Sequence, residues 1–258
     1  LTDKDFAHWC MLCGKVTDEA ATGLLPIYQW QRAQQWFTEH GTAEEQAQID
    51  LYLGRAYVED GEYDKAMQIY ADALQLAKEH QAYNVAGYIC AYMADLYGFR
   101  DITSECLKKR EEACEFFKKA ENYKSYAYSL KDLAGEWAIL DSFACTIPLL
   151  QKADSISQLL HNKNLTAAIA NAFALIYEMQ GKYNEAETAY LKAISTRSEE
   201  SYKDSIGLLK VYIKNNKLGK AYELIKAITV HNDIAYSFNQ AYYLLYKAEG
   251  KYKEALHY

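Results

Sequence analysis

Two cysteines near the start of the chain have the spacing of reactive thiols. Cys10 and Cys13 are separated by two residues, as in redox-active dithiols and in half of a zinc site. A zinc site needs a second pair of ligands, and a redox pair of this kind accompanies a strand-helix-strand pattern. The stretch around Cys10 has helical periodicity and neither feature. We therefore expect the two thiols to pack as small core residues.

The other candidates for chemistry do not form a known catalytic motif. Cys90, Cys106, Cys114 and Cys145 are spread singly along the chain, and spacing alone does not give their pairing. The sequence has no phosphate-binding glycine loop, no His-Glu-x-x-His, no Gly-x-Ser-x-Gly and no calcium loop. We expect no enzyme, no metal site and no cofactor. A redox or small-molecule enzyme is the remote alternative.

The overall charge disfavours two classes of partner. The 258 residues carry a formal net charge of -7, which offers no broad attraction to nucleic-acid phosphates or anionic membrane surfaces. No apolar run approaches the roughly 20 residues that span a bilayer. We expect this segment to bind neither nucleic acid nor membrane.

One short pattern recurs at three places and organises the chain. The pattern Gly-x-Tyr-x-x-Ala begins at Gly61, Gly181 and Gly250, and the stretch before each glycine lacks helix breakers. This predicts a helix, a turn at the glycine and a second helix. An aromatic residue stands four positions before each glycine, and weaker copies extend that series at intervals of 40, 40, 40, 35 and 34 residues. The series is Tyr57, Tyr97, Trp137, Tyr177, Tyr212 and Tyr246. Periods of this length indicate stacked two-helix units.

The copy around Tyr57 resembles the tetratricopeptide repeat, a helix-turn-helix unit of about 34 residues. The residues that match its signature are Leu53, Gly54, Tyr57, Gly61, Ala66, Tyr70 and Ala73. The resemblance implies an all-α fold, a right-handed α-α superhelix of about seven helical hairpins in a single array. The expected hairpins cover residues 6–40, 47–80, 87–120, 127–161, 167–198, 202–232 and 236–258, the last one truncated.

The same frame predicts an N-terminal copy and an explanation for the long intervals. Trp9, Leu12 and Val16 keep the spacing of a first helix, with Cys13 at its small-residue position. We interpret the extra six or so residues of the long repeats as helices lengthened by about a turn plus longer connections. At the expected C-terminal ends of helices, a His side chain interacts favourably with the helix dipole. Gly or Asn at such an end can adopt the left-handed backbone conformation that caps the helix. These residues are His40, Gly41, His80, His161, Asn162, His231 and Asn232.

In tetratricopeptide arrays the first helices line a concave groove, so the resemblance implies a binding face at fixed repeat positions. Tyrosine gives a large contact area at low entropic cost, which suits a peptide ligand. The alternative is that several of these side chains only pack between helices. The expected groove residues are Tyr52, Arg55, Tyr88, Tyr92, Asp95, Phe99, Tyr128, Lys131, Asn171 and Lys210. One subclass clamps a C-terminal carboxylate with Lys and Asn where this chain has Leu51 and Arg55, so that clamp is not expected.

Long repeats with Tyr-rich first helices are similar to the sensor arms of Bacteroides-type bacterial regulators. This resemblance implies a scaffold that binds protein or peptide, as the ligand-sensing or assembly arm of a larger regulatory protein. It also implies a membrane-anchored protein with this arm in the periplasm. The alternative is a free-standing cytoplasmic adaptor or peptide receptor. Self-association is compatible with both.

Overall fold

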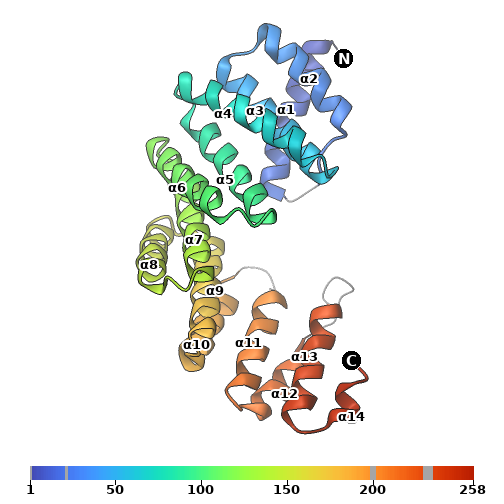
Figure 1. The fold of residues 1–258 in the computed structure, drawn as a ribbon, viewed down its shortest axis with the longest axis vertical. Helices are drawn as coiled ribbons and strands as arrows, with labels where there is room; N and C mark the ends of the chain where they lie inside the picture. The colour runs from blue at the N-terminus through green and yellow to red at the C-terminus, as the bar shows by residue number, and fades with distance from the viewer. Residues whose placement is uncertain (1, 21–22, 198–201, 229–234) are drawn as a thin grey trace. The chain divides into compact units, whose positions relative to one another are not determined.

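The computed structural model describes residues 2–20, 23–197, 202–228 and 235–258 (Figure 1). These residues form fourteen α-helices in consecutive hairpins and contain no strand, which confirms the all-α prediction and the hairpin order. The helices are α1 (Asp3–Ala20), α2 (Ile27–His40), α3 (Ala43–Glu59), α4 (Tyr63–Glu79), α5 (Tyr83–Phe99), α6 (Thr103–Lys119), α7 (Tyr123–Ile139), α8 (Phe143–Leu159), α9 (Lys163–Met179), α10 (Tyr183–Thr196), α11 (Tyr202–Lys214), α12 (Leu218–Ala227), α13 (Ala235–Ala248) and α14 (Tyr252–Ala255).

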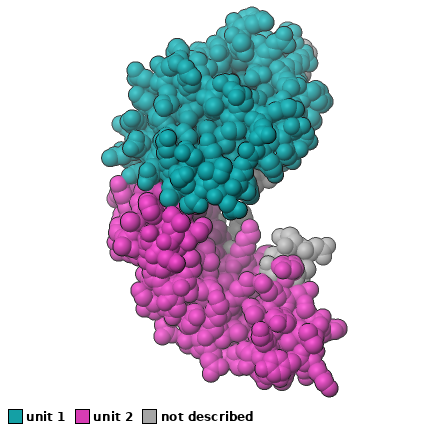
Figure 2. All heavy atoms as spheres, in the orientation of Figure 1, with its two compact units in different colours: residues 1–129 teal, residues 130–258 magenta. Residues whose placement is uncertain are grey.

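The chain divides into two compact units, unit 1 over residues 1–129 and unit 2 over residues 130–258 (Figure 2). Unit 1 contains the hairpins α1–α2, α3–α4 and α5–α6. Unit 2 contains α8 and the hairpins α9–α10, α11–α12 and α13–α14. The boundary falls within α7. Both units therefore consist of two-helix hairpins, and one single array over the whole chain stays a prediction.

Between α3 and α9 the helices have a constant length. Each has 17 residues, and three residues connect each helix to the next. Two such helices with their two connections account for the interval of 40 residues. The added length of these repeats lies in the helices alone, so the prediction of longer connections is wrong. The reason is that one compact turn closes every connection in this region.

That turn has a middle residue with positive φ, and the next residue donates its backbone N–H to the carbonyl five residues back, as in the Schellman motif. Examples are Glu62 to Tyr57 at 2.8 Å and Ser142 to Trp137 at 2.9 Å. The middle residues are Gly61, Gln81, Asp101, Glu121, Asp141, His161 and Gly181. A residue other than glycine costs about 1 kcal/mol in this conformation. The glycine signal therefore marks only some of the turns.

The predicted caps need two corrections. Gly41 has a φ of -87°, outside the left-handed region, because the following residue already caps α3. The Thr42 hydroxyl accepts the N–H of Glu45, and the Glu45 carboxylate accepts the N–H of Thr42. The second correction is that His161 itself adopts the left-handed conformation, while the side chain of Asn162 caps the start of α9. The predicted pair at 231 and 232 lies outside the described residues.

The helices also begin earlier than the predicted hairpin ranges. The starts expected at 47, 87, 127 and 167 lie four residues inside helices that begin at Ala43, Tyr83, Tyr123 and Lys163. The first turn of each helix precedes the first signature residue and follows the preceding connection directly. The signature therefore identifies the helix without marking its first residue.

Aromatic rings packed on glycines join the helices of unit 1. Gly54 of α3 lies beneath Tyr70 of α4, so close that a Cβ atom at Gly54 would be 2.3 Å from the ring. Tyr52 of α3 lies on Gly14 of α1 in the same way, at 2.4 Å. Large side chains thus fill the space that small ones leave, which gives the core its close packing.

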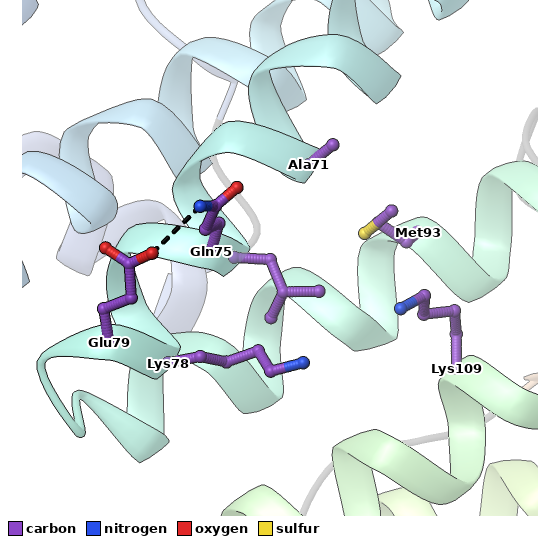
Figure 3. Close-up of a pocket in the computed structure, with 7 residues that line it drawn as sticks. Ala71, Gln75, Lys78, Glu79, Met93 and Lys109 are labelled. Atoms are coloured by element: carbon purple, nitrogen blue, oxygen red, sulfur yellow. Dashed lines mark hydrogen bonds between the residues drawn. The ribbon is translucent and has the colours of Figure 1, made fainter.

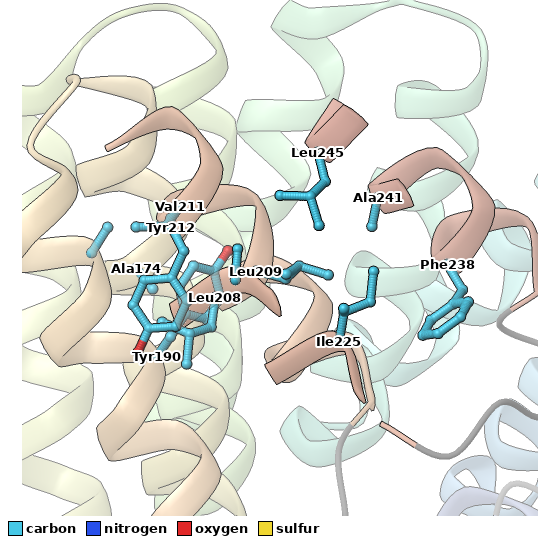
Figure 4. Close-up of a cluster of buried hydrophobic side chains, with 12 residues drawn as sticks. Ala174, Tyr190, Leu208, Leu209, Val211, Tyr212, Ile225, Phe238, Ala241 and Leu245 are labelled. Atoms are coloured by element: carbon cyan, nitrogen blue, oxygen red, sulfur yellow. The ribbon is translucent and has the colours of Figure 1, made fainter. Parts of the chain in front are cut away.

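Unit 2 has a core of similar composition around α11. Leu208 and Leu209 of α11 lie between Tyr190 of α10 on one side and Phe238 and Leu245 of α13 on the other (Figure 4). All five side chains are buried. This core continues through the shorter helices α10 to α13, which have 14, 13, 10 and 14 residues. The shorter repeats near the C-terminus thus keep the same way of packing.

Candidate functional site

The paired cysteines of α1 belong to its packing against α2. Cys10 is fully buried, and its thiol lies 3.9 Å from the carbonyl oxygen of Gln29, to which it donates. Burial raises the pKa of Cys10 to about 11, and burial also raises the pKa of Cys13. A raised pKa suppresses the thiolate, which is the form that attacks disulfides and binds metals. The environment of the pair favours packed thiols over a reactive site.

Two further features of the described chain bear on chemistry and on location. Across the described ranges, no group of three or more His, Cys, Asp or Glu side chains is arranged to hold a metal ion. None of the helices that the structure describes combines the length and the apolar character needed to cross a membrane.

Tyr52 lies in the core of unit 1, although its position in the repeat predicts a place in the groove. The side chain is 0% exposed. Its ring packs on Trp30 of α2, with ring centroids 5.4 Å apart, and its hydroxyl accepts a hydrogen bond from Gln48 Nε2 at 2.8 Å. A partner on the surface reaches none of its atoms. For Tyr52 the alternative of packing between helices holds.

A stacked group of aromatic and charged side chains lies where α3 meets α5. The guanidinium carbon of Arg55 is 4.9 Å from the centre of the Tyr92 ring, and Tyr92 stacks on Tyr70 with centroids 6.3 Å apart. Arg55 and Tyr92 are half-buried, whereas Tyr70 beneath them is fully buried. Stacking on a ring orients the planar guanidinium and leaves its edge for hydrogen bonding.

Asp95 extends this group along α5 and reveals a residue that the sequence analysis missed. Asp95 Oδ1 accepts a hydrogen bond from Arg110 Nη2 of α6 at 2.6 Å, and the Arg110 side chain is 12% exposed. Arg110 stands 40 residues after Tyr70, at the position where the repeat signature has an aromatic residue. An arginine at a position that usually holds a buried aromatic residue could have predicted a charged partner there, and this was the signal available in the sequence.

Tyr88 and Tyr128 flank the same part of unit 1. The Tyr88 hydroxyl lies 2.8 Å from Ser125 Oγ of α7, and Tyr128 stands one helical turn after Ser125. Both tyrosines are half-buried, whereas Phe99 at the end of α5 is 76% exposed. We call Arg55, Tyr88, Tyr92, Asp95 and Tyr128 the first-helix face of unit 1.

Two of the predicted groove residues of unit 2 interact with side chains beside them. Lys131 forms an ion pair with Asp132, the next residue of α7. Lys210 of α11 donates to Gln240 Oε1 of α13 at 3.0 Å. Both lysines are half-buried. A groove that they share with the residues of unit 1 stays a prediction.

The third, Asn171, is part of a buried polar network. Its Nδ2 donates to Asp204 Oδ1 at 2.5 Å, and Asp204 also accepts from Arg197 Nε at 3.0 Å. Asp204 is 1% exposed, and hydrogen bonds of this kind replace the water that a buried carboxylate has lost. The network fastens α9 to α11, which gives Asn171 a structural role within unit 2.

A pocket of about 440 Å³ opens between α4 and α6, and Met93 of α5 also lines it (Figure 3). Lys78 and Lys109 extend into it from opposite sides. Lys109 Nζ donates to Glu112 Oε2 at 2.8 Å, and the same carboxylate oxygen lies 3.6 Å from the thiol of Cys90. Burial raises the pKa of Cys90 to about 12, so this thiol stays protonated. Glu112 balances the charge of Lys109, and Glu79 lines the pocket together with Lys78, so charges of both signs meet there.

Consecutive two-helix hairpins closed by one repeated turn define an α-helical repeat fold. Residues 53–81 and residues 166–200 each match a family model described as tetratricopeptide repeat. The chain therefore contains tetratricopeptide repeats at these two places, as the signature around Tyr57 indicates. No curated protein matches it in a sequence comparison.

Several solved structures share the fold. A tetratricopeptide repeat protein from Parabacteroides merdae superposes with a TM-score of 0.65 at 14% identity, covering 97% of this chain and 90% of that one. The STAND protein with a tetratricopeptide repeat sensor from Pyrococcus horikoshii gives 0.71 at 16% identity, covering 88% of this chain but 38% of that one. A Rap protein complexed with competence and sporulation factor gives 0.64 at 13% identity, covering 99% and 84%. At these identities the likeness defines the fold alone.

Proposed function

We propose that this chain is a scaffold that binds a protein or peptide through the first-helix face of unit 1. The observation that carries the proposal is the stack of Arg55 on Tyr92, half-exposed on two adjacent first helices. Arginine and tyrosine dominate the energetics of many protein interfaces, because each combines a large contact area with hydrogen bonding. Here both are held in place before a partner arrives, which reduces the entropy lost on binding.

The scaffold is further proposed to be the ligand-sensing or assembly arm of a larger bacterial regulatory protein, with the arm in the periplasm. Two similar structures support the sensor part: one contains a tetratricopeptide repeat sensor, and the other is a complex with competence and sporulation factor. The complete gene tests this arrangement. A membrane-spanning stretch encoded soon after Tyr258 supports the sensor arm, whereas a stop codon after one more helix supports the cytoplasmic adaptor.

Peptide selection tests the binding face directly. Peptides selected from a random displayed library against the immobilised chain are expected to lose about tenfold or more in affinity on Arg55→Ala and on Tyr92→Ala, since truncated interface anchors cost about 1–2 kcal/mol or more. Affinity is measured by isothermal calorimetry. Circular dichroism confirms that each variant keeps its helices.

The matched control is Tyr63→Ala on α4, a tyrosine that is 43% exposed and lies outside the first helices. The control is expected to bind the selected peptides as the wild type does. Equal losses in the control and in the two site variants, or no loss in any of them, would remove the proposed binding face.

A further inference from the structure

The first helix has an apolar face that unit 1 leaves open. Trp9, Leu12 and Val16 of α1 are 40%, 61% and 54% exposed, and their spacing places them on one side of the helix. These are the residues that keep the first-helix spacing of the repeat, and their counterparts in α3 and α5 are buried or half-buried. Three neighbouring apolar side chains on one open helix face are a feature of interaction sites more than of ordinary surface.

The contacts of α1 with α3, and of α3 with α5, show which residues of α1 and α3 are equivalent. Gly14 of α1 packs on Tyr52 of α3, just as Arg55 of α3 packs on Tyr92 of α5. Gly14 therefore corresponds to Arg55. With the same shift of 41 residues along the sequence, the open residues correspond to three residues of α3. These are Asp50 for Trp9, Leu53 for Leu12 and Tyr57 for Val16.

On α3 this same face is covered by the second helix of the preceding hairpin. Gln34 of α2 donates to Asp50 Oδ1 at 2.7 Å, and Gln31 donates to the Tyr57 hydroxyl at 2.9 Å. Between these two contacts Leu53 is only 1% exposed. The interface recurs one hairpin later, where the equivalent α5 residues Cys90 and Met93 are 0% and 5% exposed.

We propose that the open face of α1 docks an amphipathic α-helix from a partner protein, placed on α1 as α2 is placed on α3. The interface between α2 and α3 is the template, and α1 continues the same surface by one more hairpin. The chemistry of the partner follows from the differences between the two faces. Where α3 has the Asp50 carboxylate and the Tyr57 hydroxyl, α1 has the largely apolar side chains of Trp9 and Val16, so the docked helix carries an apolar ridge about two to three turns long.

A pocket beside this face supplies a place for a long side chain of the docked helix. Its volume is about 450 Å³, and Leu12 lines it together with Met11 and Phe37. Lys15 and Glu44 also line the pocket, so its surroundings are polar on two sides. The apolar floor and polar surroundings suit the ridge of an amphipathic helix.

The second helix α4 is a suitable probe, because it covers the apolar α5 face in this same interface. A labelled peptide of residues 62–80 is titrated with the full chain and followed by fluorescence anisotropy. We expect saturable binding that Leu12→Lys weakens about tenfold or more, since the charge would have to be buried beneath the helix. Leu159→Lys is the control, at a leucine of α8 that is 80% exposed. It should leave the affinity unchanged.

Three results would overturn the proposal. One is the absence of saturable binding, and another is equal binding by the chain with Leu12→Lys. The third is self-association of the peptide-free chain, measured by light scattering, that Leu12→Lys abolishes, because a second copy would then be the occupant. A scrambled peptide of the same composition, which lacks the apolar ridge, should not bind. Failure here leaves the first-helix face of unit 1 untouched, because that face is tested by other variants.

Discussion

The helices α1 and α3 have equivalent positions in the repeat and opposite surroundings. Leu53 of α3 is 1% exposed beneath α2, and its counterpart Leu12 of α1 is 61% exposed. Their inner faces are alike, since Cys10 and Met11 are buried just as Leu51 and Tyr52 are. The comparison shows that the apolar pattern of a repeat specifies which face needs a cover. Whether a cover is present depends on the neighbouring hairpin.

The largest expected effect comes from truncating the two matched leucines. Leu53→Ala should lower the free energy of unfolding by about 3 kcal/mol, because it removes buried methyl groups and leaves a cavity between α2 and α3. Leu12→Ala should change it by no more than about 0.5 kcal/mol, because water already reaches that side chain. Urea denaturation followed by circular dichroism measures both variants.

Both variants remove the same atoms from equivalent repeat positions, so a difference in stability between them reports the surroundings of each leucine. Similar losses of stability in the two variants would mean that Leu12 is covered in solution. In that case the contrast between the two helices would disappear. Light scattering at the same protein concentration would then show whether the cover is a second copy.

The sequence predicts the hairpin order well where glycine marks a turn and less well elsewhere. Gly61, Gly181 and Gly250 have positive φ, as the recurring pattern indicates. Asp101, Glu121 and other non-glycine residues make the same turn with a positive φ. At these positions the packing of the two helices that the turn connects imposes the conformation. No local signal announces such a turn, so its position follows only from the constant length of the helices.

The candidate site could be predicted as a set of positions, but not by the exposure of each residue. Tyr52 and Tyr92 occupy equivalent positions in successive repeats. Tyr52 is enclosed by Trp30 and Gly14 of the first hairpin, whereas Tyr92 lies beneath the Arg55 side chain and keeps an accessible surface. These surroundings come from residues some 20 to 40 positions away. A repeat signature read along one hairpin does not contain them.

A second prediction concerns Asp50, an acid on the covered face of α3 whose counterpart on the open face of α1 is Trp9. Burial raises the pKa of Asp50 from 3.8 to about 6, against a hydrogen bond from Gln34 that favours the carboxylate. Between about pH 4 and pH 6 the folded state therefore holds more protons at Asp50 than the unfolded state does. Folding stability falls as the pH rises through this window and stays lower above it.

Asp50→Asn should accordingly stabilise the chain by roughly 1–2 kcal/mol at about pH 7.5, because it removes the buried charge and keeps an oxygen for Gln34. The gain should vanish near pH 4, where the wild-type carboxyl group is protonated. Thermal and urea denaturation at both pH values measure this difference. The matched control is Glu59→Gln, at an exposed acid of the same helix, and should be nearly neutral at both. A gain that is equal at the two pH values would exclude ionisation of Asp50 as its cause.

The smallest expected effect concerns the hydroxyl at the far end of the covered face. Tyr57→Phe removes the hydrogen bond from Gln31 Nε2, 2.9 Å long, and keeps the aromatic ring in place. Gln31 is exposed, so water can satisfy its amide once the hydroxyl is gone. The loss should be about 0.5–1 kcal/mol in the same urea denaturation experiment. A loss as large as that of Leu53→Ala would contradict this account, because α2 would then be held on α3 by its polar contacts. The apolar face of α1 would in that case lack the contacts that hold a helix in this position.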